Sequence, residues 1–451
     1  MTKHNASPED LAHQVLMKIK DAKISYPVPS IEILNKLFKT LFYTSLKTEE
    51  DQYIRVTLTF IDPKNPDPSP PMRIVADRWQ FVHFESTIPF TVPNLVKLSK
   101  AADVWSSSLA VYYNNKNELI IWGMIDQAVH YQSFLNYESD SDSGPEQPGL
   151  FQSTITGIGS LVVIFDYELI ANLRQDTLTS NYIDVFKRGE VKDIFQKNSS
   201  QFKDAIKKYL EKEFPKEVFD IWESYIEYFL KESLSRILLR IQNYKHGGAV
   251  LITDNFESDL DVKYSIGYNR LSQAMERVSQ LTIANSNYSN EIDSEYVDKK
   301  EESLPVVLYL DEYISELDND EAKNGLKGAI RFVASLSCVD GLVLLDHNLN
   351  VKGFGTVVKM NKLPEIVYFS KTAKVNLTKL GEVNPNSYGT RHRSMFSYCW
   401  NHEGSIGFVI SQDGDVRAIT KVANKLIMWE NIKVQQFFDS LKLKKPLSKF
   451  K

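Results

Sequence analysis

The chain of 451 residues contains only two cysteines, Cys338 and Cys399, far apart in the sequence. This number and spacing exclude a disulfide framework and favour free thiols in a reducing compartment. Long apolar runs are also missing, since the stretch around Leu161–Phe165 is far shorter than the roughly 20 residues of a membrane-spanning helix. The first residues, Met1–Asp10, are polar and have no apolar signal-peptide core behind them. We therefore expect a cytoplasmic protein with no membrane partner.

An excess of positive charge is missing as well. The formal net charge is -5, and beyond a short tail at Lys442–Lys451 there is no block of basic residues. A surface built to bind nucleic acid is normally basic, so we expect no nucleic-acid partner. With 25% charged and 43% hydrophobic residues, the composition is that of a folded globular protein with two or three domains.

Several well-known catalytic motifs do not occur. The eight histidines include no zinc-binding helix pair, and there is neither a P-loop nor a serine-nucleophile elbow. Gly157–Gly159 begins like a dinucleotide fingerprint, but Val162 stands at the third glycine position and a strand is expected to follow. The acids near Asp311 and at Asp318–Glu321 could recruit a metal, although a solvated helix flank also explains them.

What is present in the first half is a mixture of helical and strand patterns. Residues 8–46 have apolar spacing typical of two helices around a turn. Leu109–Tyr113 and Leu119–Trp122 are predicted to form a hairpin around Asn114–Asn117. Glu138–Gly149 has almost no apolar residues and should be a surface loop. The first half is therefore predicted to be a mixed α+β domain.

The second half begins with a strongly helical stretch at residues 199–243. Gly247–Thr253 has the pattern of a buried strand, Pro305–Leu310 is predicted as another strand, and Ala322–Ser337 as a helix. This order predicts a second region of α/β type, in which helices flank a sheet.

Two short motifs in this region suggest phosphate chemistry. Asp340-Gly341 opens a predicted hairpin that ends at Val358, and Gly389-Thr390-Arg391-His392-Arg393 follows about thirty residues later. Arginine offers bidentate donors, threonine a hydroxyl and glycine a close backbone approach, as phosphate groups require. Taken singly, each motif also has a plain structural explanation: Asp-Gly is a common turn, and the basic run could be a solvated turn.

In combination, the two motifs resemble the diadenylate cyclase family, whose signatures are Asp-Gly-Ala and Gly-Thr-Arg-His-Arg in this order. The second signature is complete at residues 389–393, and the first departs from the family only at Leu342. Gly247–Ile252 and Val409–Ser411 are also similar to family strands. The resemblance covers residues 230–425.

The resemblance implies a fold and a reaction. The fold class would be α/β (α+β), with a C-terminal mixed β-sheet flanked by helices and a mixed α+β domain before it. The reaction would be the metal-dependent condensation of two ATP molecules into cyclic di-AMP and two pyrophosphates, with Mn²⁺ or Mg²⁺ as the cofactor. Each 3′-oxygen attacks the other nucleotide's phosphorus, so two facing sites and hence a homo-oligomer are implied.

The resemblance also assigns residues. The implied catalytic residues are Asp340, Arg391, His392 and Arg393. The implied nucleotide-binding residues are Gly341, Leu342, Gly389, Thr390 and Ser411. The implied metal ligands are Asp340 and Asp413.

Four segments follow from these patterns. They are a sensor-like α+β domain at 1–195, a helical connector at 196–229, the cyclase-like domain at 230–425, and a C-terminal helix with a basic tail at 426–451. The first segment resembles the sensor-like region found ahead of some divergent diadenylate cyclase domains in bacteria. Its tryptophans, Trp79, Trp105 and Trp122, are predicted to be core residues rather than ligand-stacking ones.

Departures from the family pattern leave a second interpretation open. Val339 replaces a histidine, Leu342 an alanine and Gln412 a common acid, while Cys399–Glu403 stands where a glutamate and a Thr-Asp pair are usual. These changes suit a divergent enzyme or a catalytically silent nucleotide-binding sensor in bacterial signalling or defence. A third interpretation is a structural α/β protein whose motifs are accidental.

Overall fold

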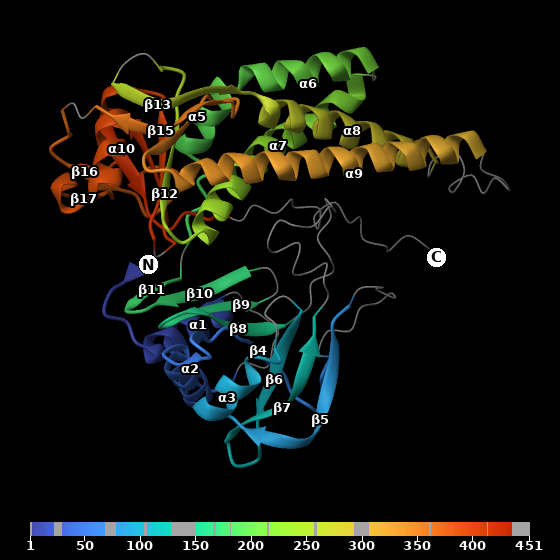
Figure 1. Ribbon diagram of the computed structural model, residues 1–451, viewed down its shortest axis with the longest axis vertical. Helices are drawn as coiled ribbons and strands as arrows, with labels where there is room; N and C mark the ends of the chain where they lie inside the picture. The colour runs from blue at the N-terminus through green and yellow to red at the C-terminus, as the bar shows by residue number, and fades with distance from the viewer. Residues whose placement is uncertain are drawn as a thin grey trace. The chain divides into compact units, whose positions relative to one another are not determined.

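A computed structural model describes residues 2–21, 29–67, 78–102, 106–127, 150–165, 168–180, 182–213, 216–256, 259–292, 306–359, 362–412 and 414–434. The described chain divides into two compact units, one up to Tyr182 and the other from Ile183 onward (Figure 1). Each has its own sheet and hydrophobic core. The mixed α+β class predicted from the sequence is confirmed.

The first unit is a nine-stranded sheet with helices packed on it. Its strand order is β1-β11-β10-β9-β8-β4-β6-β7-β5, and β2 and β3 form a separate pair. The helices are α1 (Pro8–Asp21), α2 (Ile31–Ser45) and α3 (Val92–Leu98). The strands are β1 (Thr2–Lys3), β2 (Thr48–Glu49), β3 (Gln52–Tyr53), β4 (Thr57–Phe60), β5 (Gln80–Pro89), β6 (Ser107–Tyr113), β7 (Leu119–Asp126), β8 (Phe151–Gly157), β9 (Ser160–Phe165), β10 (Glu168–Arg174) and β11 (Thr177–Thr179).

Alternation along the strands builds the core of the first unit. In β4, Leu58 and Phe60 join the core with Leu34 and Leu41 of α2, because successive strand residues point to opposite faces. The predicted helix pair and the β6–β7 hairpin are confirmed. Ser30 caps α2, since its hydroxyl accepts a hydrogen bond from the amide of Ile33.

The second unit also holds a nine-stranded sheet, in the order β13-β15-β14-β12-β18-β19-β20-β16-β17. Its helices are α5 (Glu190–Asn198), α6 (Ser200–Glu213), α7 (Lys216–Asn243), α8 (Arg270–Ile292), α9 (Val306–Ser335) and α10 (Thr390–Asn401), with short 3₁₀ turns η2 (Leu336–Cys338) and η3 (Pro385–Ser387). Its strands are β12 (Gly248–Ile252), β13 (Leu260–Tyr268), β14 (Leu342–Leu345), β15 (Val351–Val358), β16 (Val367–Phe369), β17 (Gly381–Val383), β18 (Ile406–Ile410), β19 (Val416–Val422) and β20 (Lys425–Trp429).

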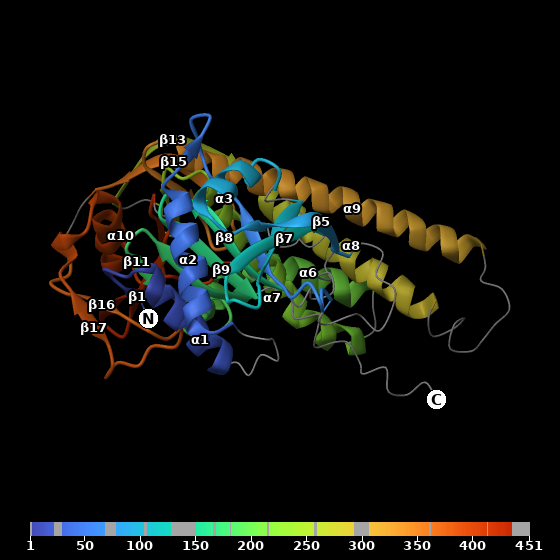
Figure 2. The ribbon, with the colours of Figure 1, turned by 90° about the horizontal axis from the view of Figure 1, so that it is seen from below.

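Helices cover both faces of this second sheet. Val250 and Ile252 of β12 belong to one core cluster with α7, α8 and α9, whereas Ala249 and Leu251 belong to another with α10. Figure 1 shows the sheet between α10 on one side and α7 and α9 on the other, and Figures 1 and 2 both show α8 and α9 running side by side. A strand buried on both faces explains the continuous apolar run of β12.

Three sequence predictions differ from the structure. The predicted strand Pro305–Leu310 is wrong from Val306 onward, because α9 begins there; a short apolar run does not distinguish a strand from a buried helix. The predicted C-terminal helix from residue 426 is wrong at its start, where β20 pairs with β19. The predicted connector at 196–229 is part of the second unit, since its residues Phe202 and Ile206 lie in that unit's core.

Some predictions lie outside the described residues. They concern Trp105, the loop at Glu138–Gly149, Asp413 and the basic tail at Lys442–Lys451. Trp79 and Trp122 are described, and both are buried in a small core cluster of the first unit, as predicted.

Candidate functional site

The register of three neighbouring strands brings the motif residues to one end of the second sheet. β14 is parallel to β12, with Val343 opposite Val250, and β18 is antiparallel to β12, with Ile410 opposite Gly248. The residues before β12, before β14 and after β18 therefore lie at the same end. This arrangement places Asp340 and Gly341 on the same sheet end as Ser411.

The Asp-Gly motif makes a tight backbone contact with the next strand. Gly341 has a φ of +118°, and a Cβ there would lie 2.4 Å from the carbonyl carbon of Gly355. Gly355 also has a positive φ, of +60°. Only glycine adopts such a conformation at so close an approach without strain. Gly341 is thus required by the β14–β15 pairing itself, while the neighbouring Asp340 side chain is exposed.

The second motif forms the start of α10. Gly389 is the N-cap, with no side-chain cap hydrogen bond, and a Cβ placed there would meet no atom within 4 Å. Thr390 and Arg391, the first two helical residues, are exposed. The first amides of a helix have no intrahelical acceptor and lie at the positive end of its dipole. The start of α10 therefore offers open, unhindered donors to an anion.

Arg391 connects the start of α10 with the start of β12. Its Nη1 donates a hydrogen bond to the carbonyl oxygen of His246, at 3.4 Å. A Cβ on Gly247 would lie 2.7 Å from the same nitrogen, so glycine makes room for the guanidinium. The two predicted motifs, separated in sequence by nearly fifty residues, thus lie at the same end of the sheet.

His392 is turned toward β19. Its Nε2 accepts a hydrogen bond from Nη1 of Arg417, at 3.0 Å, and its ring lies 5.2 Å from that of Tyr388. Burial, followed by the charges of Arg417 and Arg391, lowers the pKa of His392 to about 4. Because arginine only donates hydrogen bonds, the ring is a neutral imidazole whose Nδ1 carries the proton. His392 can therefore donate one hydrogen bond but does not contribute a positive charge.

The remaining predicted residues have different surroundings. Ser411 closes the β18–β19 turn, since its Oγ accepts a hydrogen bond from the amide of Asp415 at 3.0 Å. Leu342 is buried in the core cluster beneath α10, so its bulk is accommodated by packing. The buried Nε of Arg393 has no hydrogen-bond partner among the described residues. Such a donor is costly to leave unpaired in the absence of a ligand or water.

The side chains that could bind the predicted metal ion are few among the described residues. Among the described residues, no group of three or more His, Cys, Asp or Glu side chains could hold a metal ion. Asp340 is a single exposed carboxylate. Mg²⁺ is commonly held by one or two carboxylates together with substrate phosphates, so Asp340 fits as one ligand of a nucleotide-bound ion.

Sequence reasoning did not identify Arg417 or His246 as parts of this site. Arg417 is one basic residue on a strand, and only the pairing of β19 beside β18 brings it to His392. Nε2 of His246 lies 3.1 Å from Sγ of Cys338, and the carbonyl oxygen of His246 accepts the hydrogen bond from Arg391. Its position directly before the predicted strand Gly247–Thr253 was the available signal.

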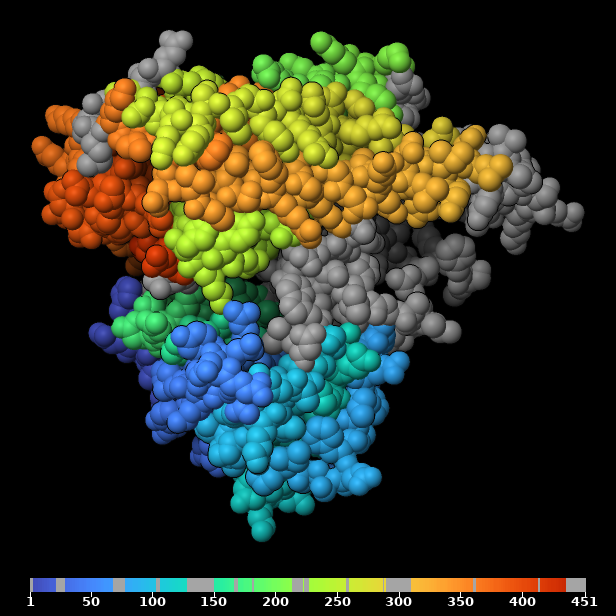
Figure 3. Space-filling view, in the orientation of Figure 1, coloured from blue at the N-terminus to red at the C-terminus, as the bar shows by residue number. Residues whose placement is uncertain are grey.

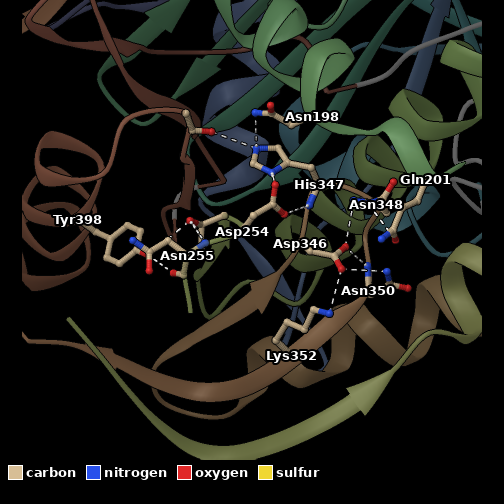
Figure 4. A network of polar contacts seen from close by, with 12 residues as sticks. Asn198, Gln201, Asp254, Asn255, Asp346, His347, Asn348, Asn350, Lys352 and Tyr398 are labelled. Carbon is tan, nitrogen blue, oxygen red and sulfur yellow. Dashed lines mark hydrogen bonds and ion pairs between the residues drawn. The ribbon is translucent and has the colours of Figure 1, made fainter. Parts of the chain in front are cut away.

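A separate polar network lies at the opposite end of the same sheet (Figure 4). His347 is only 2% exposed; its Nδ1 lies 2.8 Å from Oδ2 of Asp254, and its Nε2 lies 3.0 Å from the carbonyl oxygen of Gly404. Nε2 also lies 3.4 Å from the side-chain nitrogen of Asn198, so the ring contacts three different segments. Asp346 similarly accepts hydrogen bonds from the amides of Asn348 and Asn350. This network joins the turns at that end of the sheet.

Comparison with known proteins gives one family match. The family described as "Probable sensor domain DACNV" matches residues 23–126, within the first unit. This sensor domain is the N-terminal domain of diadenylate cyclase-like proteins. No curated protein matches the chain. In the part of the chain that the structure describes, every helix is too short or too polar to cross a membrane.

Proposed function

With a diadenylate cyclase-type sensor domain at residues 23–126 as the premise, we propose that the second unit is a diadenylate cyclase-like domain. It would bind ATP at the sheet end that carries Asp340 and the start of α10, and condense two ATP molecules into cyclic di-AMP and two pyrophosphates. The observation that supports this proposal is the strand register, which brings Asp340 to the same sheet end as Arg391.

The proposed roles follow from the surroundings of each residue. The first amides of α10, the Thr390 hydroxyl and the Arg391 guanidinium would bind the phosphates, because all are exposed donors at one helix start. The Nδ1–H of His392 would add a neutral donor, and Arg393 would find its missing acceptor in the same phosphate groups. Ser411 would border the site at the end of β18.

Asp340 would hold Mg²⁺ or Mn²⁺ beside the ribose. When bound, the metal ion would neutralise phosphate charge and favour ionisation of the 3′-hydroxyl. Asp413, which lies outside the described residues, is the second proposed ligand. In each half of the reaction a 3′-oxygen forms a bond to the α-phosphorus of the other ATP, the bond to pyrophosphate breaks, and one proton is released. Two copies of the chain are therefore needed.

A catalytically silent nucleotide-binding sensor is the second candidate, and one observation favours it. Among the described residues no group of three possible metal ligands occurs, and Asp340 itself is exposed. In that case the start of α10 would still bind phosphates, but no metal would be positioned to activate the 3′-hydroxyl. The bound nucleotide would then act as a signal in bacterial signalling or defence.

The test is incubation of the purified chain with ATP and Mn²⁺ or Mg²⁺, with cyclic di-AMP followed by chromatography. We expect product from the unchanged chain and none above background from Asp340→Asn. Glu365→Gln, a change of an exposed acid in a loop of the same unit, is the matched control and should keep full activity. Nucleotide binding without product would favour the silent sensor, and the absence of both would contradict both candidates.

A further inference from the structure

The outer face of α9 carries large apolar side chains that are about half exposed. Leu310, Tyr313, Ile314 and Leu317 are 48%, 51%, 54% and 51% exposed. Residues 310, 314 and 317 follow one another at intervals of four and three, so they lie on one stripe of the helix. The other side of α9, with Leu326, Ile330 and Val333, is buried in the core of the second unit. Figure 3 shows α9 in front of the neighbouring helices along its length.

The same face continues into the second half of α9, where two of its residues are glycines without side chains. The helical period places Glu321, Gly325, Gly328 and Phe332 on the same face. A Cβ at Gly325 or at Gly328 would meet no atom within 4 Å, so the surface there is open. Phe332 is 43% exposed. The face is thus bulky and apolar in its first half, and hollow in its second half.

Charge divides α9 at the same point. The acidic residues all lie at or before the middle of the helix, at Asp311, Glu312, Glu316, Asp318, Asp320 and Glu321. The basic residues all lie in the second half, at Lys323, Lys327 and Arg331. A parallel pair of such helices would place acids beside acids, whereas an antiparallel pair places the acidic half of each helix beside the basic half of the other.

We infer that α9 is a self-association surface that binds a second copy of the chain in antiparallel orientation. With the two-fold axis near Glu321, Leu317 of one copy lies opposite Gly325 of the other, and Ile314 lies opposite Gly328. Leu310 then lies near the other copy's Phe332. Large side chains fill the open space over glycines, and small residues let two helices approach closely.

One feature opposes this pairing. The two Glu321 side chains approach each other at the axis, and facing like charges repel. Both are solvent-exposed, where water and salt screen the repulsion, while the association buries several large apolar side chains. Removal of the charge in Glu321→Gln should therefore strengthen the association.

The inference goes beyond the proposed function, because α9 contributes none of the residues assigned to ATP. Sedimentation of the full chain without nucleotide over a concentration series tests it. We expect a dimer, at least about tenfold weakened in the double variant Ile314→Glu, Leu317→Glu. Leu377→Glu, a change of a 47% exposed leucine elsewhere in the second unit, should leave the dimer unchanged. Circular dichroism and the melting temperature establish that the double variant stays folded.

Disulfide formation between copies tests the orientation. The starting chain carries Cys338→Ser, because Cys338 is exposed; Cys399 is buried, and burial raises its thiol pKa to about 12, so it can remain. In that chain, Glu321→Cys should give a disulfide-linked dimer on mild oxidation, while Leu310→Cys should not. Linkage at both positions would indicate parallel helices and contradict the inference. A chain that stays monomeric up to roughly 100 µM would overturn it, whatever the outcome of the cyclase assay.

Discussion

His392 is held in its neutral form by burial and by two arginines. In the unfolded chain the ring takes up a proton near its ordinary pKa of 6.5, whereas in the folded chain its pKa is about 4. Between these two values the unfolded state binds more protons, so the free energy of unfolding falls as the pH is lowered through this range. Above pH 6.5 both states are neutral, and the effect vanishes.

We therefore expect the unchanged chain to lose more stability between about pH 7 and about pH 5 than His392→Gln does. Glutamine keeps an acceptor for the nearby Nη1 of Arg417 but does not titrate. Urea unfolding at several pH values measures the difference. Stability curves that run parallel at all pH values would show that the ring is not held neutral in the folded chain.

Gly341 and Gly389 both belong to the predicted motifs, but their surroundings differ, so replacing them should have different effects on stability. Gly341→Ala should destabilise the chain by about 1–3 kcal/mol or more, because its φ is +118° and the new Cβ would meet the backbone of Gly355. Gly389→Ala should change stability by no more than about 1 kcal/mol, since its φ is −66° and the space around it is open. Urea unfolding of both variants measures this, and equal losses would contradict the assignment.

At the scale of elements, the turn between β14 and β15 depends on His347. This turn is held to the end of β12 through Asp254 and to the turn before β18 through the carbonyl of Gly404. The ring itself is buried, so its removal takes away both side-chain contacts and leaves space in the turn.

His347→Ala should therefore lower the free energy of unfolding by about 1–3 kcal/mol. The matched change is His13→Ala on α1, an exposed histidine of the first unit, which should have little effect. Denaturant unfolding of the full chain gives both values. A loss no larger than that of His13→Ala would mean that the network at this end of the sheet adds nothing to stability.

Elements with a clear period were predicted correctly, whereas one short apolar run was assigned to the wrong type of element. The β14–β15 hairpin agrees with the sequence prediction, because Asp340-Gly341 marks its start. The run Val306–Leu310 was predicted as a strand, yet it begins a 30-residue helix. Packing against α8 decided between the two, and the local sequence did not contain that contact.

At the scale of the whole molecule, the chain has two cores without shared residues. The boundary lies between Tyr182 and Ile183, earlier than the predicted residue 195. Residues from Ile183 onward belong to the second unit because Ile183 pairs with Ile432, near the far end of the described chain. A contact between residues so distant in sequence leaves no local signal for a domain boundary.

The sequence by itself determined the class of the fold, the position of the two motifs that we propose to bind phosphate, and the sensor-like character of the first unit, which the family match supports. These features are local, since they depend on periodicity, on turn residues and on short motifs. Only the tertiary structure decided that Asp340 and Arg391 share one sheet end, that burial and Arg417 keep His392 neutral, and that Leu342 packs in the core. Each of these depends on strand register, which is set by pairing between segments far apart in the chain.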